Sequence, residues 1–458
     1  MRHAVYYLAV AEQAAPHLTG SERATWLEKI ARAHDNMCKV LQRSHSMQEG
    51  ADVGLRLAGA LWWFWQVRGY LSEGREYLTK VLAQEQALER ASARVKALHG
   101  LAFLTYRQGE YTLARSLCEQ CLTFERAHDD ERGISSVLNT LGLIASSEGD
   151  YSTARTYYEE GLAIDRELGN LYGIAVGLNN LGMIARDQGD YARARELYEE
   201  SLKISGELRD RDSIAEVLNN LGNVESDQCH YAEAYHLYQE SLTIKQKLGN
   251  RPGIAVALNN LGTIAFLQGE YVRAEKYFAE SLAARRELGD QRGVGESLFN
   301  LATVLGEQGN ISEAYRRQEE SLAIIRNLGD NKGIAYCLSN LGRLCLRKGE
   351  YEKGAGFLRE SLTLLRKLED SLGIVSTLEA YAALMTQQGK PERAARLLGA
   401  TESIRAATNI PIVPVEQAEY EQNVARVCAA LSEQIFHEEW AQGREMNEDQ
   451  AVAYALES

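Results

Sequence analysis

The sequence predicts an all-α protein built as a solenoid of stacked helical hairpins, with a helical cap at each end. Three observations predict it. A period of 40 residues runs through most of the chain, apolar residues recur at helical spacing within each period, and glycine separates the two halves of the period. Each hairpin is too small to bury its own apolar face, so neighbouring hairpins must stack.

The composition of the 458-residue chain agrees with a folded protein of this kind. Hydrophobic residues make up 45% of it, which is enough for a large core and argues against intrinsic disorder. The net charge of −14 repels phosphate groups, so we expect no direct nucleic-acid partner. No apolar run is long enough for a membrane helix, and the 7 cysteines are too sparse for a disulfide framework. We therefore expect a cytoplasmic protein without a membrane partner.

We expect four regions along the chain. Residues 1–50 form an N-terminal helical cap or linker, and residues 51–90 form a degenerate repeat-like unit. Eight full 40-residue units follow between residues 91 and 410, and residues 411–458 form a C-terminal helical cap. A solenoid needs such atypical ends, because they cover the apolar faces that the terminal hairpins would otherwise expose.

Within each full unit the pattern predicts two antiparallel helices, which we call helix A and helix B. In one unit, helix A spans 172–188 and helix B spans 191–208, with a glycine in the turn because glycine adopts the left-handed cap conformation at little cost. The block Leu-Asn-Asn-Leu-Gly recurs in helix A at 178–182, 218–222 and 258–262. The glycines of the 40-residue grid are Gly109, Gly149, Gly189, Gly269, Gly309, Gly349 and Gly389, with Cys229 at the remaining point.

This pattern resembles the tetratricopeptide repeat (TPR) family. One unit matches the family motif at Leu178, Leu181, Gly182, Gly189, Tyr191, Ala194, Tyr198 and Leu202. The usual unit has about 34 residues, so this longer period is similar to the long-helix form found in kinesin light chains and bacterial regulators. The resemblance implies a right-handed superhelix in which helix A of each repeat lines a concave groove that binds a protein or peptide.

Both ends of the chain resemble large bacterial STAND-class regulators (signal-transduction NTPases with numerous domains), including LuxR-type and SARP-type transcription factors. In that family the repeat array is the sensor: it binds an inducer or partner and relieves autoinhibition of an upstream nucleotide-binding module. No G-x-x-x-x-G-K-[ST] phosphate loop occurs here, so the resemblance implies the sensor region of such a regulator. The alternative is a stand-alone scaffold or peptide-pheromone receptor without a nucleotide switch. The matching segments are 3–18, 26–42, 55–78, 393–422 and 436–456.

The sequence contains no arrangement of residues that predicts catalysis, a cofactor or a metal ion. No His-Glu-x-x-His motif occurs, and the pair formed by Cys118 and Cys121 lies in the middle of a helix without a second pair. We therefore expect a binding protein rather than an enzyme.

Two columns of asparagines along helix A are the strongest candidates for a binding site. Amide side chains both donate and accept hydrogen bonds, so amides repeated along a groove can pair with successive peptide groups of an extended ligand. The alternative is that the amides join neighbouring helices inside the array. The first column is Asn180, Asn220, Asn260, Asn300 and Asn340, and the second includes Asn179, Asn219 and Asn259.

Specificity is expected from residues one turn further along helix A, which differ between units. Their character changes from mixed charge, through apolar at Phe266, to basic near Arg343. This series suits a peptide that carries an aromatic group with an acidic side chain or a C-terminal carboxylate. The alternative is that the arginines only pair with a neighbouring acid such as Glu307. The candidates are Met183, Arg186, Asn223, Asp227, Thr263, Phe266, Thr303, Arg343 and Arg347.

Overall fold

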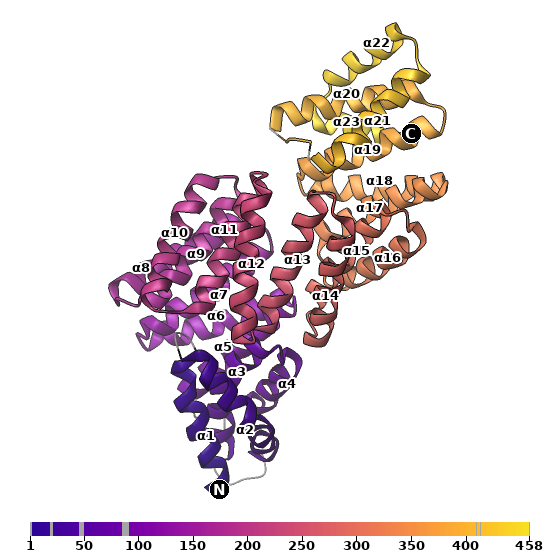
Figure 1. Cartoon of the computed structure of the whole chain (residues 1–458). Helices are drawn as coiled ribbons and strands as arrows, with labels where there is room; N and C mark the ends of the chain where they lie inside the picture. The colour runs from indigo at the N-terminus through magenta and orange to yellow at the C-terminus, as the bar shows by residue number, and fades with distance from the viewer. Residues whose placement is uncertain are drawn as a thin grey trace. The chain divides into compact units, whose positions relative to one another are not determined.

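The computed structural model describes residues 2–18, 22–44, 50–84, 91–408, 410–412 and 414–457. Across these residues the chain forms 23 α-helices and one short 3-10 helix, without a β-strand (Figure 1). The predicted all-α fold of helix–turn–helix repeats is therefore confirmed. None of the described helices has both the length and the apolar character needed to cross a bilayer.

The chain divides into two compact units. The first unit consists of residues 1–261 and 283–291, and the second consists of residues 262–282 and 292–458. The boundary runs through α13 (Arg251–Leu267) and α14 (Tyr271–Leu288).

The first unit contains the N-terminal helices and four complete helical hairpins. The N-terminal helices are α1 (Arg2–Ala14), η1 (Ala15–His17), α2 (Arg23–Arg43), α3 (Gly50–Arg68) and α4 (Leu71–Leu82). The hairpins are α5 (Ala91–Arg107) with α6 (Tyr111–Ala127), α7 (Glu131–Ser147) with α8 (Tyr151–Glu167), α9 (Leu171–Asp187) with α10 (Tyr191–Glu207), and α11 (Arg211–Asp227) with α12 (Tyr231–Leu248).

The second unit contains three complete hairpins followed by three C-terminal helices. The hairpins are α15 (Gln291–Glu307) with α16 (Ile311–Asn327), α17 (Asn331–Lys348) with α18 (Tyr351–Lys367), and α19 (Ser371–Gln387) with α20 (Pro391–Thr408). The C-terminal helices are α21 (Pro414–Ala430), α22 (Glu433–Arg444) and α23 (Glu448–Leu456).

The turn between helices A and B uses one left-handed residue in each repeat. Gly189 has φ +80°, and the carboxylate of Asp190 then accepts a hydrogen bond from the backbone N–H of Arg193, which caps α10. Cys229 takes the same left-handed conformation at φ +63°, so the turn is kept where the grid lacks glycine.

A glycine near the middle of helix A makes room for an aromatic ring of helix B. A Cβ on Gly182 would lie 2.7 Å from the Tyr198 ring, and a Cβ on Gly222 would lie 2.7 Å from the Tyr238 ring. The space beside each of these glycines is filled by the ring, because the aromatic side chain needs the volume that a Cβ would occupy.

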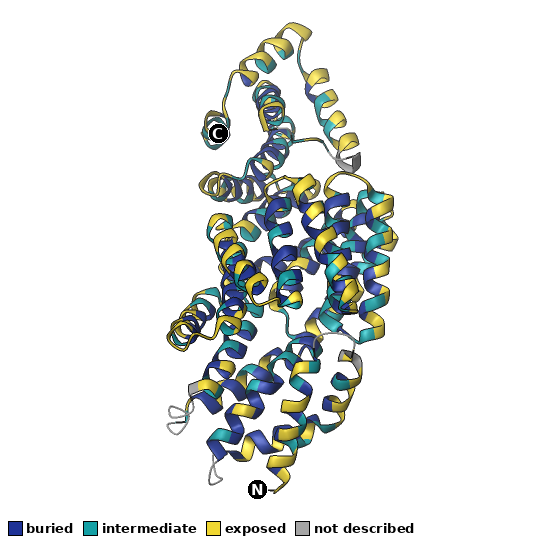
Figure 2. Ribbon diagram, turned by 90° about the vertical axis from the view of Figure 1, so that its left-hand side faces the viewer, coloured by how far each residue is buried: buried dark blue, intermediate teal, exposed yellow. Residues whose placement is uncertain are grey.

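A buried serine on helix B ties each of several hairpins together. Ser201 Oγ donates to the carbonyl of Ala175 at 2.7 Å, and Ser321 Oγ donates to the carbonyl of Gly295 at 2.7 Å, 26 residues earlier in each case. In the ribbon coloured by burial, buried residues lie on the helix faces that pack against neighbouring helices, and exposed residues lie on the outer faces (Figure 2). Phe64 and Trp65 on α3 are fully buried in the first unit, so these two aromatic residues belong to its core.

Candidate functional site

The predicted asparagine columns form a hydrogen-bonded ladder in the first unit. Asn220 Nδ2 donates to Asn179 Oδ1 at 2.9 Å, which joins α11 to α9. Asn260 Nδ2 donates to Asn219 Oδ1 at 3.0 Å, which joins α13 to α11. Asn180 Nδ2 makes the equivalent bond to Asn139 Oδ1 on α7, at 3.4 Å. These amides therefore connect neighbouring helices A, as the alternative interpretation proposes.

The ladder is largely shielded from solvent. Asn179, Asn180, Asn220 and Asn259 are all less than a tenth exposed. Asn223 extends the network, because its Oδ1 accepts from Tyr238 at 2.7 Å and from Asn260 at 3.2 Å. The first-unit amides are thus engaged within the array, and a role for them in ligand binding stays a prediction.

We predict that Asn220→Ala lowers the stability of the first unit. The substitution leaves the buried Asn179 carbonyl without its donor from α11, which costs about 1–3 kcal/mol. Urea denaturation followed by circular dichroism measures the change, and Asn327→Ala at an exposed position of α16 is the matched control. An Asn220→Ala chain as stable as the control would contradict a structural role for the ladder.

The other predicted residues of the first unit are also engaged with neighbours. Met183 is half-buried against the core around Tyr198. Arg186 Nε lies 2.6 Å from Asp227 Oδ2, which links α9 to α11 by an ion pair. These contacts continue the stacking of adjacent hairpins.

A cavity of about 380 Å³ lies within the second unit, and we call it the second-unit cavity. Helices A of successive repeats supply most of its lining residues, and α21 supplies three more. Its polar residues include amides, hydroxyls and two arginines, and its apolar residues include three phenylalanines. The lining residues are Thr263, Phe266, Leu267, Phe278, Phe299, Asn300, Thr303, Gly306, Glu307, Tyr336, Ser339, Asn340, Arg343, Leu344, Arg347, Ser376, Glu379, Leu398, Glu419, Tyr420 and Asn423.

Seven of the predicted ligand-binding residues line this cavity. They come from α13, α15 and α17, at the repeat positions that the sequence singles out. The seven are Thr263, Phe266, Asn300, Thr303, Asn340, Arg343 and Arg347. The remaining ten lie in the first unit and do not line it: Asn179, Asn180, Asn219, Asn220, Asn259, Asn260, Met183, Arg186, Asn223 and Asp227.

The arginines of the cavity wall are fixed by neighbouring repeats. Arg347 Nη2 lies 2.7 Å from Glu307 Oε1, which is the alternative pairing with a neighbouring acid that the sequence suggests. Its Nη1 donates to the Gly306 carbonyl at 2.9 Å. Arg343 Nη2 donates to the carbonyl and hydroxyl oxygens of Ser376 at 2.6 and 3.0 Å. Both guanidinium groups are thus held in place before any ligand arrives.

The repeat pattern does not predict the part of the cavity wall that α21 supplies. Glu419, Tyr420 and Asn423 line the cavity, whereas the sequence predicts only a C-terminal helical cap for this region. Burial, together with the nearby carboxylates of Glu379 and Glu402, raises the pKa of Tyr420 to about 12. In the sequence, Tyr420 is the one residue that could have indicated a contribution of α21 to the cavity wall, and the 40-residue repeat register does not extend to α21.

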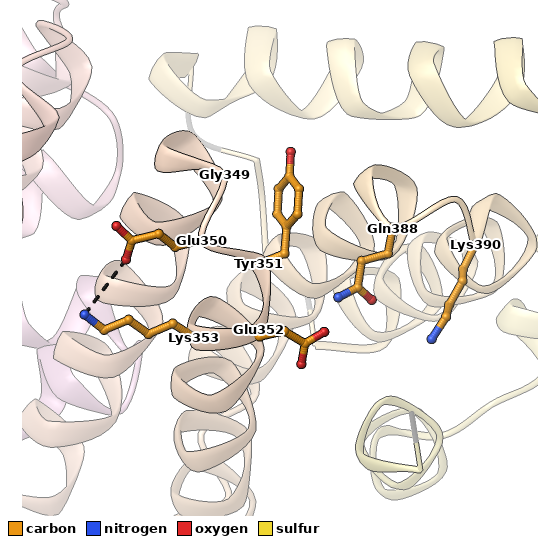
Figure 3. Close-up of a pocket in the computed structure, with 7 residues that line it drawn as sticks. All are labelled: Gly349, Glu350, Tyr351, Glu352, Lys353, Gln388 and Lys390. Atoms are coloured by element: carbon orange, nitrogen blue, oxygen red, sulfur yellow. Dashed lines mark ion pairs between the residues drawn. The ribbon is translucent and has the colours of Figure 1, made fainter.

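A second cavity, which is more open to solvent, lies at the turns that follow α17 and α19 (Figure 3). Glu350 Oε2 lies 3.9 Å from Lys353 Nζ, and this lysine also lies over the ring of Tyr315 at 4.6 Å. In the close-up, Tyr351 points away from Glu352 and from Lys390, so the side chains do not converge on one point. This cavity is therefore the weaker candidate for a ligand site.

One cluster of side chains in the described residues has the composition of a metal site. The ligand atoms of His34, Cys38 and Glu73 lie within 4.8 Å of one another in the N-terminal helices. Trp65 Nε1 donates to His34 Nε2 at 3.1 Å, and the Cys38 thiol donates to Glu73 at 3.2 Å. Burial and Glu73 raise the pKa of Cys38 to about 12, which disfavours the thiolate that a metal needs. The side chains of His34, Cys38 and Glu73 therefore already have hydrogen-bond partners within the protein.

The buried pair Cys118 and Cys121 has the properties of core thiols. Both side chains are fully buried in α6, and Cys121 Sγ donates to the Val95 carbonyl at 3.7 Å. Burial raises the pKa of Cys121 to about 12, so its thiol stays protonated near neutral pH.

Comparison with known proteins gives one family match. A family model described as a tetratricopeptide repeat matches residues 93–167, 173–247, 253–327 and 301–367, which together cover more than half of the chain. A comparison with curated proteins finds no match.

Several solved structures are similar in fold. A Rap protein complexed with competence and sporulation factor matches with a TM-score of 0.57 and 14% identity, over 80% of this chain and 99% of that chain. Aspartyl phosphate phosphatase F from Bacillus subtilis matches with a TM-score of 0.49 and 13% identity, over 78% of this chain and 95% of that chain. BtubC from P. vanneervenii matches with a TM-score of 0.42 and 20% identity, over 48% of this chain and 92% of that chain.

Proposed function

We propose that this chain, which belongs to the tetratricopeptide repeat family, holds a peptide or a protein segment in the second-unit cavity. The observation that supports the proposal most directly is the lining of this cavity. Equivalent positions of α13, α15 and α17 meet there, and they offer the aromatic rings of Phe266 and Phe299, the amide of Asn340, and two arginines. A peptide presents groups complementary to each of these.

The size of the cavity sets the scale of the ligand. A volume of about 380 Å³ is at the lower end of ordinary ligand pockets, so it suits a few side chains or a small inducer. Asn340 Nδ2 donates to Gln318 at 2.9 Å and to Thr303 at 3.1 Å, so its amide is already oriented for an incoming group. We propose that Asn300 and Asn340 bind main-chain groups of the ligand and that Phe266 and Phe299 hold an apolar side chain.

The finer proposal is that the chain is the sensor region of a STAND-type regulator acting in the cytoplasm. The resemblance of both chain ends to such regulators supports it. Signal transfer would be a population shift, in which the ligand prefers one contact between the array and an upstream nucleotide-binding module. An upstream coding sequence with a G-x-x-x-x-G-K-[ST] motif in the same reading frame would support this form of the proposal.

The alternative is a stand-alone scaffold or a peptide receptor without a nucleotide switch. The fold likeness to the Rap protein complexed with competence and sporulation factor, over 80% of this chain, supports this alternative. The sensor proposal and the stand-alone proposal both include peptide binding by the repeat array. They differ in the process that the bound state controls.

Selection from a displayed library of random short peptides tests the common proposal. We expect the immobilised chain to enrich related peptides, and Thr303→Trp, which fills the cavity, to lose them. Thr243→Trp at an exposed position of α12 is the control and should enrich the same peptides as the unmodified chain. Melting temperatures verify that each variant is folded. Enrichment that is unaffected by Thr303→Trp, or an absence of enrichment, would overturn the proposal.

A further inference from the structure

Arg343 stands out among the charged residues of the second-unit cavity. Within the wall, Glu307 neutralises Arg347, and Glu379 pairs with Arg405 at 3.0 Å with both side chains nearly buried. Arg343 is held by the uncharged oxygens of Ser376. Counting Arg405, which pairs with the lining residue Glu379, the repeat helices place three arginines and two carboxylates around the cavity.

The missing negative charge comes from α21. Glu419 Oε1 lies 3.9 Å from Arg343 Nη1, and Glu419 Oε2 lies 3.6 Å from Arg347 Nη2. Among the described residues, Glu419 is the carboxylate within ion-pair distance of Arg343. A helix outside the repeats thus places a carboxylate between the two arginines of the cavity.

This contact is weakly held. The Glu419 side chain is 45% exposed, and exposed pairs at such distances contribute little to stability. Along α21, Val427 is the one buried side chain between Gln417 and Ala430. A ligand that offers a better placed carboxylate can therefore replace Glu419 at a small cost.

The neighbourhood of the arginines defines what else the ligand carries. Phe266, Phe299 and Leu344 line the same cavity, so an apolar group can be buried while a carboxylate reaches Arg343. Guanidinium groups bind carboxylates through paired N–H donors, and the contact strengthens when water is excluded.

We propose that the second-unit cavity recognises a carboxylate next to an aromatic or other large apolar group, and that this carboxylate displaces Glu419 and loosens α21. The inference rests on the proposed peptide-binding function and names the ligand chemistry for that site. The carboxylate belongs either to a peptide C-terminus or to an acidic side chain. Displacement of α21 then provides a conformational signal of binding.

Fluorescence anisotropy with three labelled probe peptides tests the ligand chemistry. The first probe is Gly-Ser-Gly-Phe with a free C-terminus, the second is the same peptide amidated, and the third is the amidated peptide with glutamate before the phenylalanine. We expect the first or the third probe to bind and the second to bind about tenfold or more weakly, because it lacks the carboxylate. Which of the two binds identifies the source of the carboxylate.

Matched variants of the full chain test the residues. Arg343→Gln should weaken binding of the carboxylate probe about tenfold or more, and Arg343→Lys should restore part of the loss. Glu419→Gln should tighten binding a few-fold, whereas Glu421→Gln, at an exposed position of the same helix, should leave it unchanged. Hydrogen exchange of residues 414–430 should increase when the probe binds.

The outcomes separate this inference from the proposed function. Equal affinity for the amidated and carboxylate probes, or no effect of Glu419→Gln, would overturn the inference. If library peptides bind in a manner that Thr303→Trp abolishes and Arg343→Gln leaves unchanged, the peptide-binding function stands and the carboxylate inference fails. If the library yields no peptides and no probe binds, both fail.

Discussion

Alanine in place of Gly399 is expected to detach α22 from α20 and to destabilise the C-terminal end of the second unit. An added Cβ at Gly399 would collide with the backbone carbonyl of Trp440, and one at Gly443 would collide with the carbonyl of Arg396. The two helices thus cross with their backbones in direct contact. Backbone atoms cannot rotate aside as side chains do, so we expect a loss of about 3 kcal/mol or more.

Hydrogen exchange of residues 433–444 and urea denaturation measure this effect. Release of α22 would also break the bond from Trp440 Nε1 to Glu402, at 2.6 Å, and the pairing of Arg396 with Glu439. Gly356→Ala is the matched control, because a Cβ there meets nothing within 4 Å in the middle of α18. It should raise stability by about 0.5–1 kcal/mol. Equal stability of the two variants would contradict the close crossing of α20 and α22.

Removal of the Lys245 ammonium is expected to have a comparable effect on the first unit. Lys245 Nζ donates to Asp212 Oδ1 at 3.0 Å, and the two side chains are only 7% and 10% exposed. Asn250 Nδ2 donates to the same carboxylate at 2.6 Å. Lys245→Met keeps the volume and leaves the buried carboxylate without this cation, which costs about 3–5 kcal/mol.

Two further variants show whether the charge pair itself is responsible. Lys247→Met changes an exposed lysine two residues away and should leave stability within about 0.5 kcal/mol of the unmodified chain. Asp212→Asn combined with Lys245→Met should cost less than the sum of the single changes, because the charge is then removed with its partner. Additive losses in urea denaturation would refute a direct coupling between Lys245 and Asp212.

The sequence predicts the repeat helices closely because the same signals recur in every period. Helix A predicted at 172–188 is α9 at Leu171–Asp187, and helix B predicted at 191–208 is α10 at Tyr191–Glu207. The left-handed glycine fixes the turn, and the apolar spacing fixes the buried face. Signals within each repeat therefore determine where its helices A and B begin and end.

The candidate site is predicted only in part, for two physical reasons. An exposed amide and an amide bonded to a neighbouring helix have the same spacing, so the sequence does not separate Asn220 in the ladder from Asn340 in the cavity. The approach of Glu419 to Arg343 joins helices 76 positions apart, and α21 lies outside the repeat register. The repeat pattern likewise does not predict the buried ion pair of Lys245 with Asp212, because other repeats lack an equivalent pair.

The amide ladder also bears on how such proteins change in length during evolution. Each step joins one helix A to the next through the same two positions, 41 residues apart, as with Asn220 to Asn179 and Asn260 to Asn219. Duplication of a whole 40-residue segment that carries both asparagines would give the added repeat a hydrogen-bond donor toward one neighbouring repeat and an acceptor toward the other. A duplication that is not a whole number of repeats would leave an amide facing the wrong neighbour, so we expect such arrays to gain or lose length in whole repeats.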